Sequence, residues 1–335
     1  MSDSDMSTSK RAIVSFWSRR IAHALSALFA VSVLAFLFLE LAPGDYLDRI
    51  RLNPQISAET LEAMRAQYGL DRPFVERYWS WLGAVLRGTW GFSFAYGSAV
   101  APLIWARALN TLLLSVCATA LAWTLAVPAG VFWATRKSSV GPVETFMGVV
   151  TSLIVGLPEL VLAVVALIIA ARSRAFPVGG MWSIGASELT FVGRVGDLAW
   201  HLILPAAVMA LPAFALLARH VRAAVEDVMD EPFVTEARAL GIGGRRLVVH
   251  HMLRPAASPL ISIAGLSVAS LLSASFIVEV VMGWPGLGPF LLTAILARDV
   301  HVVIGGVMCS AIFVVAGGLL ADLALYLNDP RIEPN

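Results

Sequence analysis

Six long runs of apolar side chains limit what this chain can fold into. Each run is about 20 residues long or more, and a helix of that length crosses the roughly 30 Å hydrocarbon core of a bilayer. Charged or Pro/Gly-rich segments bound the runs, which cover Ile21–Ala42, Leu109–Ala134, Val143–Ala171, Leu198–Ala218, Leu260–Met282 and Val302–Leu327. In soluble domains about a quarter of the residues are charged, whereas this chain has 14% charged and 58% hydrophobic residues. The sequence therefore predicts an all-α membrane protein with about six transmembrane helices.

The positions of Lys and Arg predict the orientation of these helices. Thirteen basic residues lie in the short segments on the side of the N-terminus, against four in the short loops on the other side. Cytoplasmic loops carry the excess of Lys and Arg, and the number of spans is even, so both termini are expected in the cytoplasm. We expect residues 1–20 to be a cytoplasmic segment and residues 21–335 to be a single transmembrane domain. The polar N-terminus lacks the features of a signal peptide, so the first apolar run is expected to stay as an anchor.

The long segment 43–107 follows the first span and is expected on the outer side. Helical spacing of its apolar residues predicts short helices over Ala58–Tyr68 and Phe74–Leu86, lying against the membrane face. Its cluster of Trp, Tyr and Phe suits the level of the lipid headgroups. We interpret the segment as a packed extracytoplasmic cap, and direct contact with a ligand is the alternative.

Motifs for bond-making chemistry are absent from the sequence. An ATP-binding phosphate loop ends in Gly-Lys-Ser/Thr, but the chain has only two lysines, Lys10 and Lys137, and Arg136 stands where glycine is needed. His250 and His251 are adjacent but have no carboxylate or thiol at metal-ligand spacing. We therefore expect no enzyme activity, no cofactor and no metal in this chain. Any nucleotide would bind a different polypeptide.

The net charge and the two cysteines narrow the function further. A formal net charge of +1 gives no indication of a nucleic-acid partner. Cys117 and Cys309 both lie within apolar runs. A free thiol in such a place behaves as a small hydrophobe, so both are expected to be reduced packing residues.

Carboxylates within the apolar runs are candidates for a translocation path, because burying a charge in lipid costs several kcal/mol. Glu159 is the most central and follows Pro158 about halfway along the third run. It would face the path, near a substrate amino group, or make a hydrogen bond between helices. Glu279 and Asp322 lie nearer to the ends of their runs. A structural role is favoured for both, and Glu279 is kept as a second path candidate.

The loop 219–259, between the fourth and fifth spans, is the longest on the cytoplasmic side. Pro232 is suited to the start of a helix, Phe233–Leu240 is a good helix former, and Gly241 is free to adopt the positive φ that ends a helix. A second short helix is predicted over Arg245–Leu253, before a proline. The first helix carries Phe233, Ala237 and Leu240 at i, i+4 and i+7, a face suited to docking into a groove on a partner.

The residues of this loop resemble a known signature. Ala237-Arg-Ala-Leu-Gly241, followed by a basic pair and by Arg254-Pro-Ala-Ala-Ser-Pro259, resembles the EAA coupling loop of ABC-importer permeases. More specifically, the chain is similar to the dipeptide/oligopeptide/nickel permease family. Four further stretches match that family in order, namely Leu41-Ala-Pro-Gly-Asp45, Asn110-Thr-Leu-Leu-Leu114, Val278-Glu279 with Gly283-Trp-Pro-Gly-Leu-Gly288, and Asp322 through Asp329-Pro-Arg-Ile332.

The resemblance implies an importer of the prokaryotic inner membrane. Two permease subunits, similar but not identical, would form the path, two ATPase subunits would bind ATP and Mg, and an extracytoplasmic binding protein would deliver the substrate. The segment 43–107 would be the docking surface for that binding protein. Coupling to the ATPase is assigned to Thr235, Glu236, Ala237, Arg238 and Gly241.

Two positions depart from the family pattern. Thr235 stands where the signature has its glutamate, six residues before Gly241, and Glu236 takes the next place. Pro158-Glu159 replaces an apolar or aromatic position and would mark a substrate preference.

Three alternatives to a peptide importer remain open at this point. A secondary transporter driven by an ion gradient would show inverted repeats and paired intramembrane carboxylates. A membrane enzyme would need a convergent catalytic set. Within the ABC interpretation, peptides are the favoured substrates, with nickel chelates, sugars or other solutes as alternatives.

Overall fold

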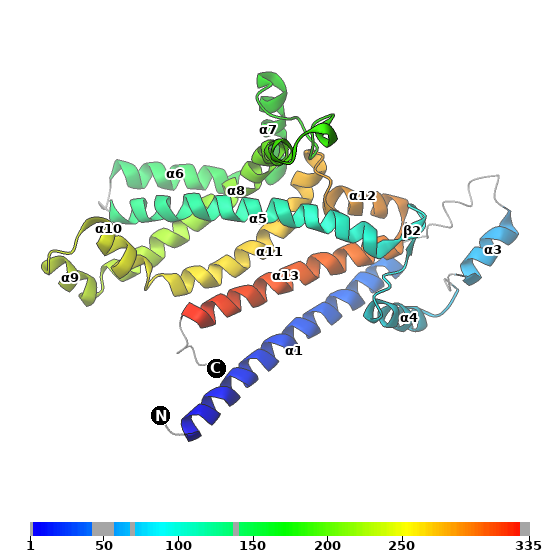
Figure 1. The fold of residues 1–335 in the computed structure, drawn as a ribbon, viewed down its shortest axis with the longest axis horizontal. Helices are drawn as coiled ribbons and strands as arrows, with labels where there is room; N and C mark the ends of the chain where they lie inside the picture. The colour runs from blue at the N-terminus through cyan, green and yellow to red at the C-terminus, as the bar shows by residue number, and fades with distance from the viewer. Residues whose placement is uncertain (1–2, 42–56, 68–70, 137–140, 329–335) are drawn as a thin grey trace. The chain divides into compact units, whose positions relative to one another are not determined.

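The computed structural model describes residues 3–41, 57–67, 71–136 and 141–328 (Figure 1). Almost all of this part of the chain is helical, and one antiparallel hairpin joins β1 to β2. The elements, in chain order, are α1 (Asp3–Leu41), α3 (Ala58–Gln67), α4 (Phe74–Leu86), β1 (Phe92–Ser93), β2 (Ser98–Ala99), α5 (Val100–Thr135), α6 (Pro142–Gly156), α7 (Glu159–Ser173), η1 (Ala186–Glu188), α8 (Phe191–Met229), α9 (Pro232–Ala239), α10 (Gly244–Arg246), η2 (Leu247–Leu253), α11 (Ala257–Val281), α12 (Leu287–Ala297) and α13 (Val300–Asn328).

Five of these helices are long and apolar enough to cross a membrane, and a bent pair brings the number to six. The five are α5, α8, α11, α13 and the part of α1 from Ser15. The predicted all-α membrane protein with about six spans is confirmed. The predicted matches at residues 42–45 and 329–332, the end of a helix at Tyr68 and the loop that holds Lys137 lie outside the described residues.

The third apolar run is not one helix, contrary to the prediction. It divides into α6 and α7, whose axes meet at 96°. Leu157 and Pro158 between them have extended backbones, with ψ of 124° and 138°. Proline has no N–H to donate and pushes the residue before it away from the helical conformation. Glu159 therefore begins α7 and does not lie in mid-helix.

The described residues fall into two compact units. The first comprises residues 1–110 and 286–315. Its core contains Phe36 of α1, Tyr78 and Trp81 of α4, and Ile304 of α13. The hydroxyls of Ser32 and Tyr78 share a hydrogen bond of 2.8 Å. The bounds predicted for α4 are confirmed, but Trp81 is buried within this unit, whereas Trp79 is 58% exposed.

A buried carboxyl group joins the hairpin of this unit to α13. Asp299, which precedes α13, accepts hydrogen bonds from Ser93 Oγ at 2.6 Å and from the backbone N–H of Ala95 at 3.0 Å. Its other oxygen lies 3.5 Å from the N–H of Val302, in the first turn of the helix. Asp299 and Ser93 are both fully buried. One side chain therefore caps a helix and holds a hairpin.

The second unit comprises residues 111–285 and 316–335. Figure 1 shows α6 running alongside α5, with α7 at a steep angle to both. The helix α7 packs against α8 and α11. The helices α5 and α8 approach closely at Gly130, because a Cβ there would lie 2.6 Å from Val221 Cβ and 2.7 Å from the carbonyl oxygen of Ala218. The free thiol of Cys117 belongs to the core of this unit, as predicted for a packing residue.

Replacing Gly130 with alanine is expected to lower stability. Its methyl group would force α5 and α8 apart, and overpacking of this kind costs about 1–3 kcal/mol. The measurement is the thermal unfolding midpoint of the purified protein in mild detergent. Gly318→Ala in α13 is the control, because a Cβ at Gly318 meets nothing within 4 Å. Equal midpoints for the two variants would contradict the close approach.

Candidate functional site

The helix α9 ends in a Schellman motif centred on Gly241. The N–H of Gly241 donates to the carbonyl of Arg238, and the N–H of Ile242 donates to the carbonyl of Ala237, both at 3.0 Å. Gly241 has φ of 79°, a conformation that glycine adopts without penalty. The predicted helix and its end at Gly241 are confirmed, with Pro232 in the first turn.

One face of α9 is buried against its own chain. Val234 and Ala237 pack into a cluster with Val221 and Val225 of α8 and with Met252 of η2. Ala237 is only 5% exposed, so the predicted docking face of Phe233, Ala237 and Leu240 is wrong at its middle position. A small residue suits this position because its side chain packs within the cluster formed with α8 and η2.

The rest of the surface of α9 is open, including positions beside Ala237. Leu240 is 74% exposed and Phe233 40% exposed. The side chains of Thr235, Glu236 and Arg238 are exposed with them. Of the five residues assigned to coupling, four are therefore accessible, Gly241 included, and Ala237 holds the helix in place.

The predicted second helix of the loop is also present. It consists of α10 followed by η2, a π-helix, and together they cover Gly244–Leu253. Leu247 and Met252 face the same cluster as α9, whereas Arg245, Arg246 and His250 are exposed. The loop thus presents apolar and basic side chains outward on two short helices.

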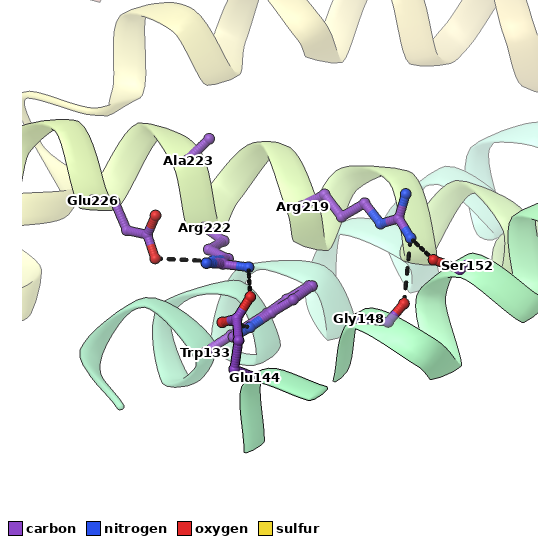
Figure 2. A pocket seen from close by; sticks show the side chains of 8 residues that line it. All are labelled: Trp133, Glu144, Gly148, Ser152, Arg219, Arg222, Ala223 and Glu226. Carbon is purple, nitrogen blue, oxygen red and sulfur yellow. Dashed lines mark hydrogen bonds and ion pairs between the residues drawn. The ribbon is translucent and has the colours of Figure 1, made fainter. Parts of the chain in front are cut away.

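A network of charged side chains joins α5, α6 and α8 (Figure 2). Arg222 lies between two carboxylates, with Nη1 2.7 Å from Glu144 Oε1 and Nε 2.8 Å from Glu226 Oε1. The indole N–H of Trp133 donates to the second oxygen of Glu144 at 2.8 Å. The guanidinium carbon of Arg222 also lies 4.5 Å from the centroid of the Trp133 ring. This network attaches α6 to the turn of α8 that supports α9.

Arg219, one turn before Arg222, also binds α6. Its Nε donates to Thr151 Oγ1 at 2.9 Å, and its Nη2 donates to Ser152 Oγ at 2.6 Å and to the carbonyl of Gly148 at 3.5 Å. Both networks line one hollow of about 420 Å³, which we call the α6–α8 groove; its residues are Trp133, Glu144, Gly148, Ser152, Arg219, Arg222, Ala223 and Glu226.

The two path candidates lie on different helices of the second unit. Glu159 opens α7 directly after the break in the third span and is half-buried. Glu279 lies near the end of α11 and is fully buried, next to the core residue Val278. Neither position tests the path assignment, which stays a prediction.

Sequence reasoning missed the α6–α8 groove and the cap at Asp299. In the sequence, Arg219 and Arg222 contribute only to the excess of basic residues on the side of the N-terminus, and Glu144 is not among the predicted site residues. A signal was present, since Glu144, Arg219 and Arg222 all stand at the ends of apolar runs, where charges of opposite sign can meet.

Comparison with known proteins identifies the family. Residues 126–334 match the model of the binding-protein-dependent transport system inner membrane component, and residues 13–124 match the N-terminal model of the same transport systems. The chain belongs to this family. It is therefore a multi-pass permease subunit of an inner-membrane import system, and the ion-gradient alternative is not favoured.

Individual relatives match this permease over nearly its whole length. The oligopeptide transport system permease protein AppB of Bacillus subtilis is 34% identical, over 94% of this chain and 98% of the relative. The glutathione transport system permease protein GsiC of Escherichia coli is 29% identical, over 94% of this chain and 97% of the relative. A crystal structure of an amino acid ABC transporter with histidines has a TM-score of 0.48 and 20% identity, and the match covers 68% of this chain and 94% of that chain.

Proposed function

We propose that this permease imports peptides, and that it does so with energy from ATP hydrolysed by separate subunits. The observation that carries the proposal is the likeness to an oligopeptide permease at 34% identity along 94% of the chain. The exposed outer face of α9 supports it, since a short helix with exposed Leu240 and Phe233 suits a groove on a partner protein.

The proposed assembly contains four further protein subunits and the surrounding lipid. They are a second, similar permease, two ATPase subunits that bind ATP and Mg, an extracytoplasmic binding protein, and the lipids of a prokaryotic inner membrane. In this arrangement the N-terminus is cytoplasmic, segment 43–107 meets the binding protein, and residues 21–335 act as one transmembrane domain. No role in this chain is proposed for nucleic acid, a metal or a catalytic residue.

Movement of the ATPases would reach the membrane through the buried face of α9. Val234 and Ala237 pack on Val221 and Val225, and close-packed side chains transmit displacement without yielding. A shift of α9 would therefore move the last turns of α8. Because Arg222 and Arg219 bind α6, the same shift would pull on the first limb of the broken third span. Alternating exposure of the path would follow from such rigid-body movement.

The break between α6 and α7 is the proposed location of the substrate path. A carboxylate at a helix start, next to non-helical backbone, is tolerated at membrane depth only where it contacts protein or water. Glu159 would meet the amino group of a peptide there. Glu279, fully buried in α11, would hold neighbouring helices in register.

An uptake experiment tests the proposal. The tagged chain is purified in mild detergent with whatever ATPase, partner permease and binding protein accompany it, and the complex is placed in liposomes. We expect ATP-dependent accumulation of a labelled tripeptide. Accumulation of a nickel chelate without the tripeptide would contradict the substrate, and failure of any ATPase to accompany the chain would contradict the energy source.

A further inference from the structure

The α6–α8 groove lies at the depth of the lipid headgroups. In α8, residues 202–218 contain no charged side chain, and Arg219 is the first charge after them. In α5, residues 108–135 are likewise uncharged, and Trp133 lies near the end of that stretch. Seventeen helical residues rise about 26 Å, close to the thickness of the hydrocarbon core. Arg219 and Trp133 therefore stand where the hydrocarbon ends, the level at which Trp and Arg gather.

The charges of the groove are balanced in number but separated in space. Arg222 pairs with both Glu144 and Glu226, so these three side chains together carry one net negative charge. Arg219 donates only to neutral acceptors, namely two hydroxyls and one carbonyl. Among the described residues no carboxylate lies within 4.0 Å of its guanidinium. The groove therefore has a cationic end at Arg219 and an anionic end at Glu226, seven residues apart on one helix.

The surroundings of the groove are apolar and open. Leu216, one turn before Arg219, is 50% exposed, and α6 exposes Phe146 and Leu153 on the side away from Gly148 and Ser152. The buried residue of α6 is polar. It is Thr151, whose hydroxyl accepts a hydrogen bond from Arg219. Small residues, Gly148 and Ala223, lie between the charged walls and leave room for a ligand. A molecule that fits must combine hydrocarbon with two separated charges.

We propose that the α6–α8 groove binds the headgroup of an aminophospholipid. Its phosphate would accept hydrogen bonds from Arg219, its ammonium group would donate to Glu226, and its acyl chains would cover Leu216. Arginine is well suited to phosphate because its N–H groups form a planar fork. A soluble phosphate matches only the cationic end and would meet the excess negative charge at Glu226, so a zwitterionic lipid is the better fit.

Binding there would brace the contact between α6 and α8 from the membrane side. The lipid would add a ligand to Arg219 at the turn that precedes Arg222, and so it would favour the arrangement in which α6 stays attached to α8. This site is separate from the proposed peptide path, and it can be tested without transport.

Lipid retention measures the proposal directly. The permease, with the subunits that accompany it, is purified from nanodiscs containing phosphatidylethanolamine, phosphatidylcholine and phosphatidylglycerol in equal parts. Retained lipid is then counted by native mass spectrometry after a wash in mild detergent. We expect enrichment of phosphatidylethanolamine in the wild type, and a loss of about tenfold in its affinity for Arg219→Gln, the size expected for one charge-assisted hydrogen-bonded contact. Arg219→Lys should keep part of it.

Matched variants separate a binding site from a general effect of charge. Glu226→Gln should reduce the preference for phosphatidylethanolamine over phosphatidylglycerol, because it removes the partner of the ammonium group. Arg245→Gln, which removes an exposed cation outside the groove, should leave retention unchanged. Displacement of the lipid by millimolar inorganic phosphate would assign the groove to a soluble anion instead. Equal retention by wild type and Arg219→Gln, with unchanged unfolding midpoints, would overturn the proposal, as would a subunit found covering the groove.

Discussion

Leu240→Asp is expected to abolish the association of this permease with its ATPase and, with it, ATP-driven uptake. Leu240 directly follows α9, and its apolar side chain is 74% exposed. Aspartate would place a charge at the centre of an apolar contact. Central contacts of an interface often contribute 2 kcal/mol or more, which is about thirtyfold in affinity. Co-purification of the ATPase with the tagged chain, and peptide uptake by liposomes, are the two measurements.

A stability measurement and one control variant show whether the lost ATPase association comes from the exposed surface of Leu240. Leu240→Asp leaves the buried face of α9 unchanged, so the unfolding midpoint should stay near that of the wild type. Gly241→Ala, by contrast, forces a methyl group into a conformation with φ of 79° and costs about 1–2 kcal/mol of stability without altering the exposed apolar surface. Its ATPase contact should weaken only modestly. Full ATPase retention by Leu240→Asp would contradict the assignment of this face.

Asp299→Ala is expected to cause the largest loss of stability. The substitution leaves the buried hydroxyl of Ser93 without its acceptor, removes the acceptor of the Ala95 N–H, and removes the cap at the start of α13. Loss of a buried charge-assisted hydrogen bond costs about 1.5–3 kcal/mol, and loss of a helix cap about 1 kcal/mol. We expect a total near 3 kcal/mol, measured as a drop of several degrees in the unfolding midpoint in detergent.

The loss of stability should come from the burial of the Asp299 carboxylate, and not from the loss of a carboxylate at any position. Glu40→Ala is the control, because Glu40 pairs with Arg77 at 2.9 Å in the same unit but remains 38% exposed. Ion pairs at the surface contribute about 0.2–1 kcal/mol. If both variants unfold at the same temperature, Asp299 does not hold the hairpin to α13.

The break in the third span shows how far local sequence rules reach. Pro158 gave a signal, since proline removes a helical hydrogen bond. Yet Pro128 lies inside α5, and Pro205 and Pro212 lie inside α8, without dividing those helices. Neighbouring helices decide whether a proline bends a span or breaks it, because they supply or withhold partners for the freed backbone groups. The position of the break was therefore readable, but its angle of 96° was not.

The sequence by itself determined the membrane class, the approximate number of spans, α4 and the end of α9. These features depend on runs of apolar residues, on helical spacing and on one glycine, all of which act within a few residues of chain. The tertiary structure alone decided that Ala237 is buried against its own chain, that Glu144 meets Arg222 78 positions away, and that Asp299 meets Ser93 206 positions away. Such pairs form because buried polar groups need hydrogen-bond partners, and the packing of the helices determines which groups meet. The distance between two residues along the chain does not indicate whether they will meet.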